Sequence, residues 1–122
     1  MILQTLPTTS GWRLFKVEDQ LDITSGPVVQ TAIAHIAEDG CRNILVDLEG
    51  VKTADEPGVN ALAGGVRQLV RVHPQARIAI VVRSRWLADA LRRHESLTGV
   101  EIFRRGTDAL RAITQPQTSL AA

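Results

Sequence analysis

Four carboxylates lie close together in the middle of the chain: Asp47, Glu49, Asp55 and Glu56. Carboxylate oxygens are the ligands that Mg²⁺ prefers in proteins, so this group has the chemistry of a metal site. Acidic residues are also common in the first turn of a helix, where they face the positive end of its dipole. Solvated carboxylates at a helix start are the more frequent case, and we expect no metal ion here.

Asp47 directly follows an apolar stretch, residues 44–46, as the phosphorylated aspartate of a receiver domain does. That chemistry also needs acidic residues after the first strand and a lysine on a late loop. Residues 12–17 supply no such carboxylates, and the late loop offers Arg83 and Arg85 in place of lysine. The sequence therefore argues against phosphoryl transfer to Asp47.

The other reactive side chains form no set suited to catalysis. The three histidines, His35, His73 and His94, lie far apart and include no pair spaced like metal ligands. Cys41 is the only cysteine and is typical of a half-buried small residue in a reducing compartment. Neither glycine-rich nucleotide motif occurs, and neither does the G-x-S-x-G motif. We predict a protein that is not an enzyme, with no catalytic residues and no cofactor.

The helix expected to begin at Pro57 has two carboxylates, Asp55 and Glu56, at its entrance. A helix start attracts anions because its N–H groups are unsatisfied and its dipole end is positive. Here the protein's own carboxylates already occupy that position, which argues against an open anion site. We interpret this turn, which follows a strand and a short acidic loop, as a surface that another protein recognises.

Apolar periodicity and caps predict the elements that hold this turn. Strands are expected at residues 12–17, 43–48, 76–82 and 100–103, with a short extended piece at 20–23. Helices are expected from Ser25 to Gly40, from Pro57 to Pro74, after Ser84 and after Thr107. Alternating strands and helices of this length favour an α/β fold with a mixed, mostly parallel sheet of four to five strands and about four helices. The strand at 12–17 is expected to be its antiparallel member.

Length and composition favour one domain with a single core, since the chain has 122 residues, of which 44% are hydrophobic and 22% charged. No apolar run approaches the roughly 18 residues of a membrane span, and the N-terminus does not resemble a signal peptide. We expect a cytoplasmic protein without membrane insertion. Residues 1–11 are expected to be an N-terminal extension, 12–114 the domain and 115–122 a flexible tail.

Charge is unevenly divided along the chain. Residues 1–61 carry four basic and nine acidic side chains, whereas residues 62–122 carry ten and four. The fold can separate these halves into an acidic and a basic end, or interleave them so that they cancel. Although arginines gather around residues 83–93 and 104–105, the net charge is only +1 and aromatics are few, so no nucleic-acid binding is expected.

The order of elements and one motif together resemble the STAS domain family, the fold of sulfate transporters and anti-sigma factor antagonists. The motif is Asp47-Leu48-x-x-Val51, then Asp55-x-x-Gly58-Val59-x-x-Leu62, and the likeness covers about residues 12–113. It implies a binding module acting in bacterial partner switching and transcription regulation. In such proteins an anti-sigma factor or related kinase binds the unmodified form and phosphorylates a Ser or Thr directly after the aspartate.

The sequence departs from the family pattern at that position, where Glu56 and Pro57 follow Asp55. Glu56 offers no hydroxyl, so it either acts as a fixed negative charge with about half the charge of a phosphate or belongs to a protein without a phosphorylation switch. Thr53 is the nearest hydroxyl and a candidate for a displaced acceptor. The family likeness also allows a subunit of a lipid-transport ATPase or of a stress-sensing complex.

The predicted partner-binding residues come from two turns: Asp22, Ile23, Thr24, Thr53, Asp55, Glu56, Pro57, Gly58, Val59 and Asn60. A bulky residue at Gly58 is expected to change partner affinity without unfolding the domain. Two other classes stay open. A small-molecule or nucleotide-binding domain would hold an anion with Arg83 and Arg85, and a homodimer would use Trp12, Phe15 or Trp86.

Overall fold

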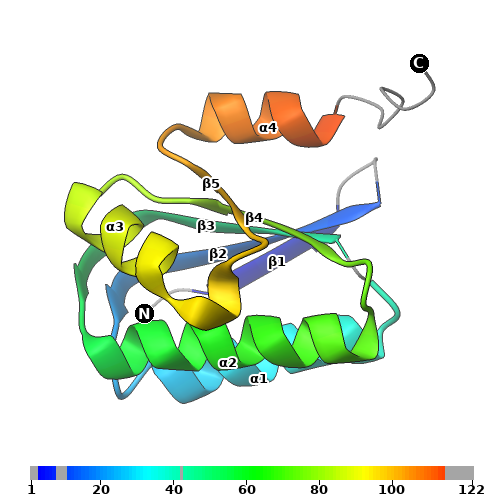
Figure 1. Ribbon diagram of the computed structural model, residues 1–122, viewed down its shortest axis with the longest axis horizontal. Coiled ribbons are helices and arrows are strands. Elements are labelled where there is room, and N and C mark those ends of the chain that lie inside the picture. The colour runs from blue at the N-terminus through cyan, green and yellow to red at the C-terminus, as the bar shows by residue number, and fades with distance from the viewer. Residues whose placement is uncertain (1–2, 8–10, 42, 115–122) are drawn as a thin grey trace.

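The computed structural model describes residues 3–7, 11–41 and 43–114, which form one five-stranded sheet with helices on both faces (Figure 1). The strands are β1 (Leu3–Pro7), β2 (Trp12–Leu21), β3 (Asn43–Ala54), β4 (Arg77–Val81) and β5 (Glu101–Phe103). The helices are α1 (Gly26–Glu38), α2 (Glu56–Val72), α3 (Arg85–Arg93), the 3-10 turn η1 (Glu95–Leu97) and α4 (Gly106–Thr114). The expected α/β fold with a mixed, mostly parallel sheet is confirmed.

The strands lie in the sheet in the same order as in the chain, β1-β2-β3-β4-β5. β1 runs antiparallel to β2, and the other neighbouring pairs are parallel. The carboxyl ends of β2 to β5 therefore meet at one edge of the sheet, where the turns into α1, α2, α3 and α4 lie. Parallel α/β sheets commonly bind ligands at this edge.

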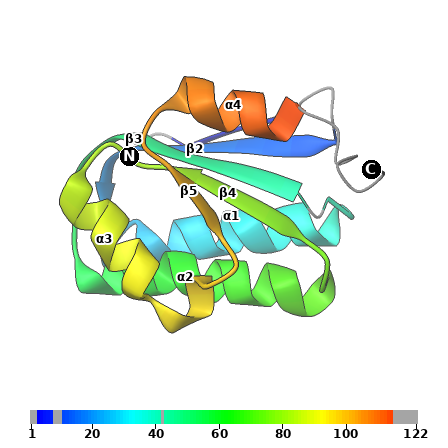
Figure 2. The ribbon, with the colours of Figure 1, turned by 45° about the horizontal axis from the view of Figure 1, so that its top comes forward.

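Two apolar clusters cover the two faces of the sheet. Alternate residues of β3 divide between them, so that Ile44 and Val46 join the larger cluster with α1 and α2 while Leu45 joins the smaller one under α4. In Figure 2, α1 and α2 lie side by side beneath the sheet and α4 lies above it. Because both faces are covered, β4 is buried along residues 78–81.

β2 and β3 are longer than the sequence analysis predicted. β2 is one strand of ten residues that includes the piece at 20–23 as far as Leu21, and it is parallel to β3 rather than antiparallel. β3 continues to Ala54, so the short acidic loop expected after the strand at 43–48 is wrong. Gly50, Val51, Thr53 and Ala54 pair with the end of β2. Two register shifts and the positive φ of Asp19, 71°, accommodate the bend in β2.

The antiparallel member of the sheet is β1, which lies within the stretch assigned above to an N-terminal extension. Leu3 to Pro7 pair with Val17 to Arg13, so the sheet begins before residue 12. The predicted tail at 115–122 lies outside the described residues. Among the described helices, none is long and apolar enough to cross a membrane.

Candidate functional site

The start of α2 is fixed by Asp55. Its backbone is extended, and its side-chain oxygen accepts a hydrogen bond from the Gly58 N–H at 2.8 Å. Its own N–H donates to the Leu21 carbonyl oxygen at 3.1 Å, which ties the helix start to the end of β2. Asp55 is therefore an N-cap, and its carboxylate is used by the protein itself.

Glu56 and Pro57 form the outward side of this first turn. Both are exposed, and within the described part of the chain the Glu56 carboxylate has no hydrogen bond or ion pair. Proline suits the first turn of a helix because no N–H is needed there, and a negative charge is stabilised by about 0.3–1 kcal/mol at this end. The Glu56 carboxylate is thus available to a second molecule.

The turn between β2 and α1 is held by the carboxylate of Asp22. One oxygen accepts from the Thr24 hydroxyl at 2.7 Å and from the Thr24 and Ser25 N–H groups at 3.0 Å each. These hydrogen bonds, that of the Thr24 hydroxyl foremost, hold the pKa of Asp22 below its ordinary value of 3.8. The Ser25 hydroxyl accepts from the Asp22 N–H and donates to the Gln20 carbonyl, so the turn is closed at both ends.

Two glycines let the starts of α1 and α2 touch. A Cβ on Gly58 would collide with the Leu21 carbonyl and lie 2.6 Å from the Asp22 nitrogen. A Cβ on Gly26 would lie 2.7 Å from the Cβ of Ala61. Only residues without a side chain permit this approach. This contact argues against the expectation that a bulky residue at Gly58 leaves the domain folded, since the obstacle is main chain that would have to move.

The predicted partner-binding residues gather at this one place, but not all face outward. Ile23 is 67% exposed, Asp22 and Asp55 are partly exposed, and Gly58 and Val59 are buried. The exposed members are Ile23, Thr24, Thr53, Glu56, Pro57 and Asn60. We call these six residues the docking face. Gly58 and Val59 support it from behind.

Sequence reasoning did not connect α3 to this face. The Asn60 side-chain oxygen lies 3.1 Å from Nε2 of His94, which follows α3. Trp86, on the first turn of α3, is 55% exposed and lines two hollows of about 290 Å³ each, one bordered by residues 51–54 and the other by Glu56 and Asn60. The sequence analysis assigned Trp86 only to a homodimer, because its exposure beside the docking face becomes visible only in the structure.

The other chemical candidates are not members of the docking face. Asp47 accepts from the Glu49 N–H at 2.9 Å, and the described residues include no group of three or more His, Cys, Asp or Glu placed to hold a metal ion. Ser84 caps α3 through the Leu87 N–H, and Arg83 and Arg85 are exposed. Trp12 and Phe15 are buried, so of the three aromatics proposed for a homodimer only Trp86 is at the surface.

Known structures with the same arrangement decide the fold. The superposition on the unphosphorylated anti-sigma factor antagonist SpoIIAA covers 94% of this chain and 100% of the SpoIIAA chain, with a TM-score of 0.73 and 16% sequence identity. This chain therefore has the STAS fold. An anti-sigma factor antagonist from Mycobacterium paratuberculosis matches 93% of this chain and 96% of its own, with a TM-score of 0.75 and 19% identity.

The phosphorylated form of the Bacillus cell fate determinant SpoIIAA shares the STAS fold as well, with a TM-score of 0.69 and 16% identity. It matches 92% of this chain and 99% of its own. No family model and no curated protein matches the sequence. The likeness is thus one of fold, and the element order inferred from the sequence as STAS-like is confirmed.

Proposed function

We propose that this chain is a non-enzymatic protein-binding module of the anti-sigma factor antagonist type, in which Glu56 stands at the place of the phosphorylated residue. The observation that carries this proposal is the exposed, unpaired Glu56 carboxylate directly after the N-cap of α2. The fold, which is that of proteins named as anti-sigma factor antagonists, supports it. In this proposal the partner is an anti-sigma factor or its kinase in a bacterial cytoplasm.

The docking face has the form of a protein-recognition surface. Its backbone is held by the hydrogen bonds of the Asp22 turn and by the packing of Gly58 on the end of β2, which favours a low cost of ordering on binding. The exposed Ile23 supplies apolar area, while Glu56 supplies charge beside it. A lipid-transport ATPase subunit or a stress-sensing complex stays an alternative partner for the same face.

Affinity capture from cells of the native host tests this proposal. Glu56→Lys and Ile23→Asp place an unfavourable charge on the docking face, whereas Glu38→Lys makes the same charge reversal at the end of α1. We expect a protein captured by the wild type and by Glu38→Lys to be recovered about tenfold less with Ile23→Asp, equivalent to about 1.4 kcal/mol, and in a clearly different amount with Glu56→Lys. Equal recovery with all four baits would contradict the proposal.

Removing the charge distinguishes the two roles of Glu56. If the carboxylate imitates a phosphorylated, released state, Glu56→Gln and Glu56→Ser should bind the captured partner more tightly than the wild type. If the carboxylate is a direct contact of a protein without a switch, both variants should bind more weakly. Mass spectrometry of the protein from native cells tests Thr53 as well. A phosphoryl group on Thr53 would identify it as the displaced phosphorylation site that acts as the switch.

A further inference from the structure

β3 extends beyond the end of the neighbouring strand β4. It pairs with β4 only from Asn43 to Asp47, whereas on its other side it pairs with β2 as far as Ala54. Beyond Asp47, the β4 side of β3 therefore has no strand neighbour among the described residues. Backbone N–H and C=O groups on such an edge need partners, and an open edge is a template for another strand.

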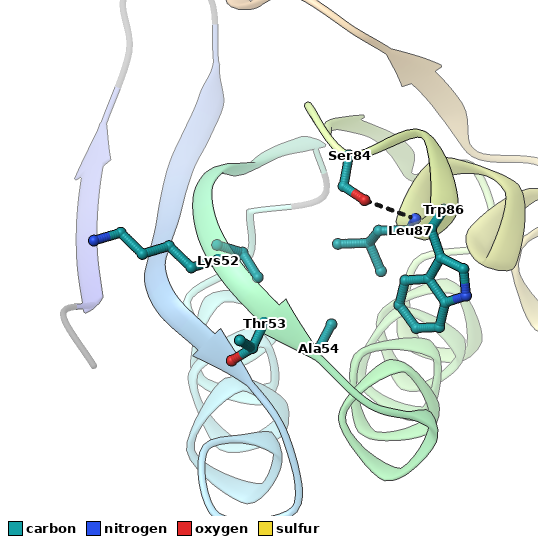
Figure 3. A pocket seen from close by; sticks show the side chains of 7 residues that line it. Lys52, Thr53, Ala54, Ser84, Trp86 and Leu87 are labelled. Carbon is teal, nitrogen blue, oxygen red and sulfur yellow. Dashed lines mark hydrogen bonds between the residues drawn. The ribbon is translucent and has the colours of Figure 1, made fainter.

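α3 lies across from this open edge and leaves a hollow between them. The hollow has a volume of about 290 Å³ and is lined by Val51 to Ala54 on β3 and by Ser84, Trp86 and Leu87. Figure 3 shows Leu87 reaching from α3 toward β3, with the ring of Trp86 beside it. In the same view the Lys52 side chain points to the other side, across β2, so its charge does not block the edge.

A second hollow borders Trp86 and reaches the docking face. This space of about 290 Å³ shares Trp86 and is lined by Glu56, Val59, Asn60, Ala90, Arg93 and His94. Together we call these two spaces the Trp86 groove. Among the described residues that line it, Glu56 is the only acidic one and Arg93 the only arginine. The exposed Arg83 and Arg85 lie outside the lining, on either side of Ser84 at the start of α3.

We propose that the Trp86 groove binds an extended, acidic segment of a protein partner. The segment pairs its backbone with the open edge of β3, places an apolar side chain between Trp86 and Leu87, and directs its carboxylates toward the arginines of α3. Strand addition of this kind takes affinity from the main chain and specificity from alternate side chains. The inference rests on the proposed function, since the segment belongs to the protein that binds the docking face.

Selection from a random peptide library on phage tests this inference without knowledge of the partner. Peptides of about nine residues are long enough for a strand of ordinary length. The immobilised proteins are the wild type, Trp86→Ala, Glu56→Lys and the control Val72→Ala, which truncates a side chain 52% exposed at the end of α2. A pool of random single-stranded RNA is titrated against the same four proteins.

We expect enriched peptides rich in Asp and Glu around a large apolar residue. Their affinity should fall at least about tenfold in Trp86→Ala and stay unchanged in Val72→Ala, as for an aromatic anchor at an interface. In the ¹⁵N spectrum of the wild type, the amides of residues 51–54 and the Trp86 indole should shift, with contacts between the peptide backbone and β3.

Three results would overturn the inference: no enriched peptide, peptides indifferent to Trp86→Ala, or Trp86-dependent binding of RNA in place of peptide. Peptides whose affinity is unchanged by Trp86→Ala but lost with Glu56→Lys would contradict only the Trp86 groove and would still support the docking face. If peptide binding is lost in neither Trp86→Ala nor Glu56→Lys, and the Glu56 variants also capture the partner as well as the wild type does, then both the Trp86 groove and the docking face are contradicted.

Discussion

Asp22 shows how one carboxylate sets the shape of the docking face. Its charged form accepts three short hydrogen bonds from the turn that it closes, and this lowers its pKa. A lowered pKa in the folded state means that the charged form stabilises the fold. This stabilisation is complete above the ordinary pKa of 3.8 and is lost as the pH falls through the lowered folded value.

The prediction is a difference in pH dependence between the wild type and Asp22→Asn. Urea unfolding from neutral pH down to about 3 should show the wild type losing more stability than the variant below the ordinary range of aspartate. The variant should be the less stable of the two at neutral pH, because asparagine keeps the acceptor but lacks the charge. Parallel pH profiles for the two proteins would show that Asp22 does not act in this way.

Gly58 sets the distance between the start of α2 and the end of β2, and its substitution should be costly. Gly58→Ala places a Cβ against the Leu21 carbonyl, which is main chain and yields only if β2 or α2 moves. We expect a loss of about 3 kcal/mol of unfolding free energy, the upper part of the range for overpacking. Gly99→Ala is the matched control, since nothing lies within 4 Å of its Cβ position.

For Gly99→Ala the expected change is a gain of up to about 1 kcal/mol from a less flexible unfolded chain. Denaturant titrations of both variants give the two values directly. A Gly58→Ala protein as stable as the wild type would mean that the start of α2 and the end of β2 are not in the close contact described.

At the scale of elements, apolar stripes and caps predicted four helices, but Ser25 makes no side-chain cap hydrogen bond and Thr107 lies inside α4 rather than before it. Ser84 and Asp55 are N-caps, and the apolar face of α2 is buried as expected. The second half of β3 was missed because Glu49, Gly50 and Lys52 interrupt any apolar alternation; these residues are extended only because β2 lies beside them. The contact of Gly58 with β2 likewise depends on residues far apart in the chain, which no local pattern contains.

The bend at the end of β2 permits a prediction about Asp19. Its φ of 71° lies in the left-handed region, between two register shifts of the strand, and its side chain is exposed. A β-branched residue is strained there, so Asp19→Val should lose about 1–2 kcal/mol of stability. Asp19→Gly should be close to neutral, because glycine adopts this conformation freely.

Gln20→Val serves as the control for Asp19→Val, since it adds the same side chain at the next position of β2 without a positive φ. Thermal and urea unfolding of the three variants measure the differences. If Asp19→Val and Gln20→Val were equally stable, the bend would store no strain at Asp19.

For the whole molecule, the strands lie in the sheet in chain order, so the acidic and basic halves of the chain occupy opposite sides of the sheet. The acidic half supplies β1 to β3 and α1, and the basic half supplies β4, β5, α3 and α4. The three ion pairs between described side chains, Arg13–Asp39, Arg77–Glu101 and Arg92–Asp89, each join residues of the same half. The two halves therefore keep their excess charge, and the docking face, with its single carboxylate Glu56, borders on the basic α3.

This separation predicts that the protein, whose net charge is +1, is retained at neutral pH and low salt by both cation- and anion-exchange resins. Retention should be strong at about 0.01 M salt, where the Debye length of about 30 Å spans one charged half, and weak at about 0.15 M. Glu38→Gln combined with Glu56→Gln should weaken retention on the anion exchanger alone. Retention by only one resin would show that the charges are mixed over the surface, and the acidic partner segment would then lose its electrostatic basis.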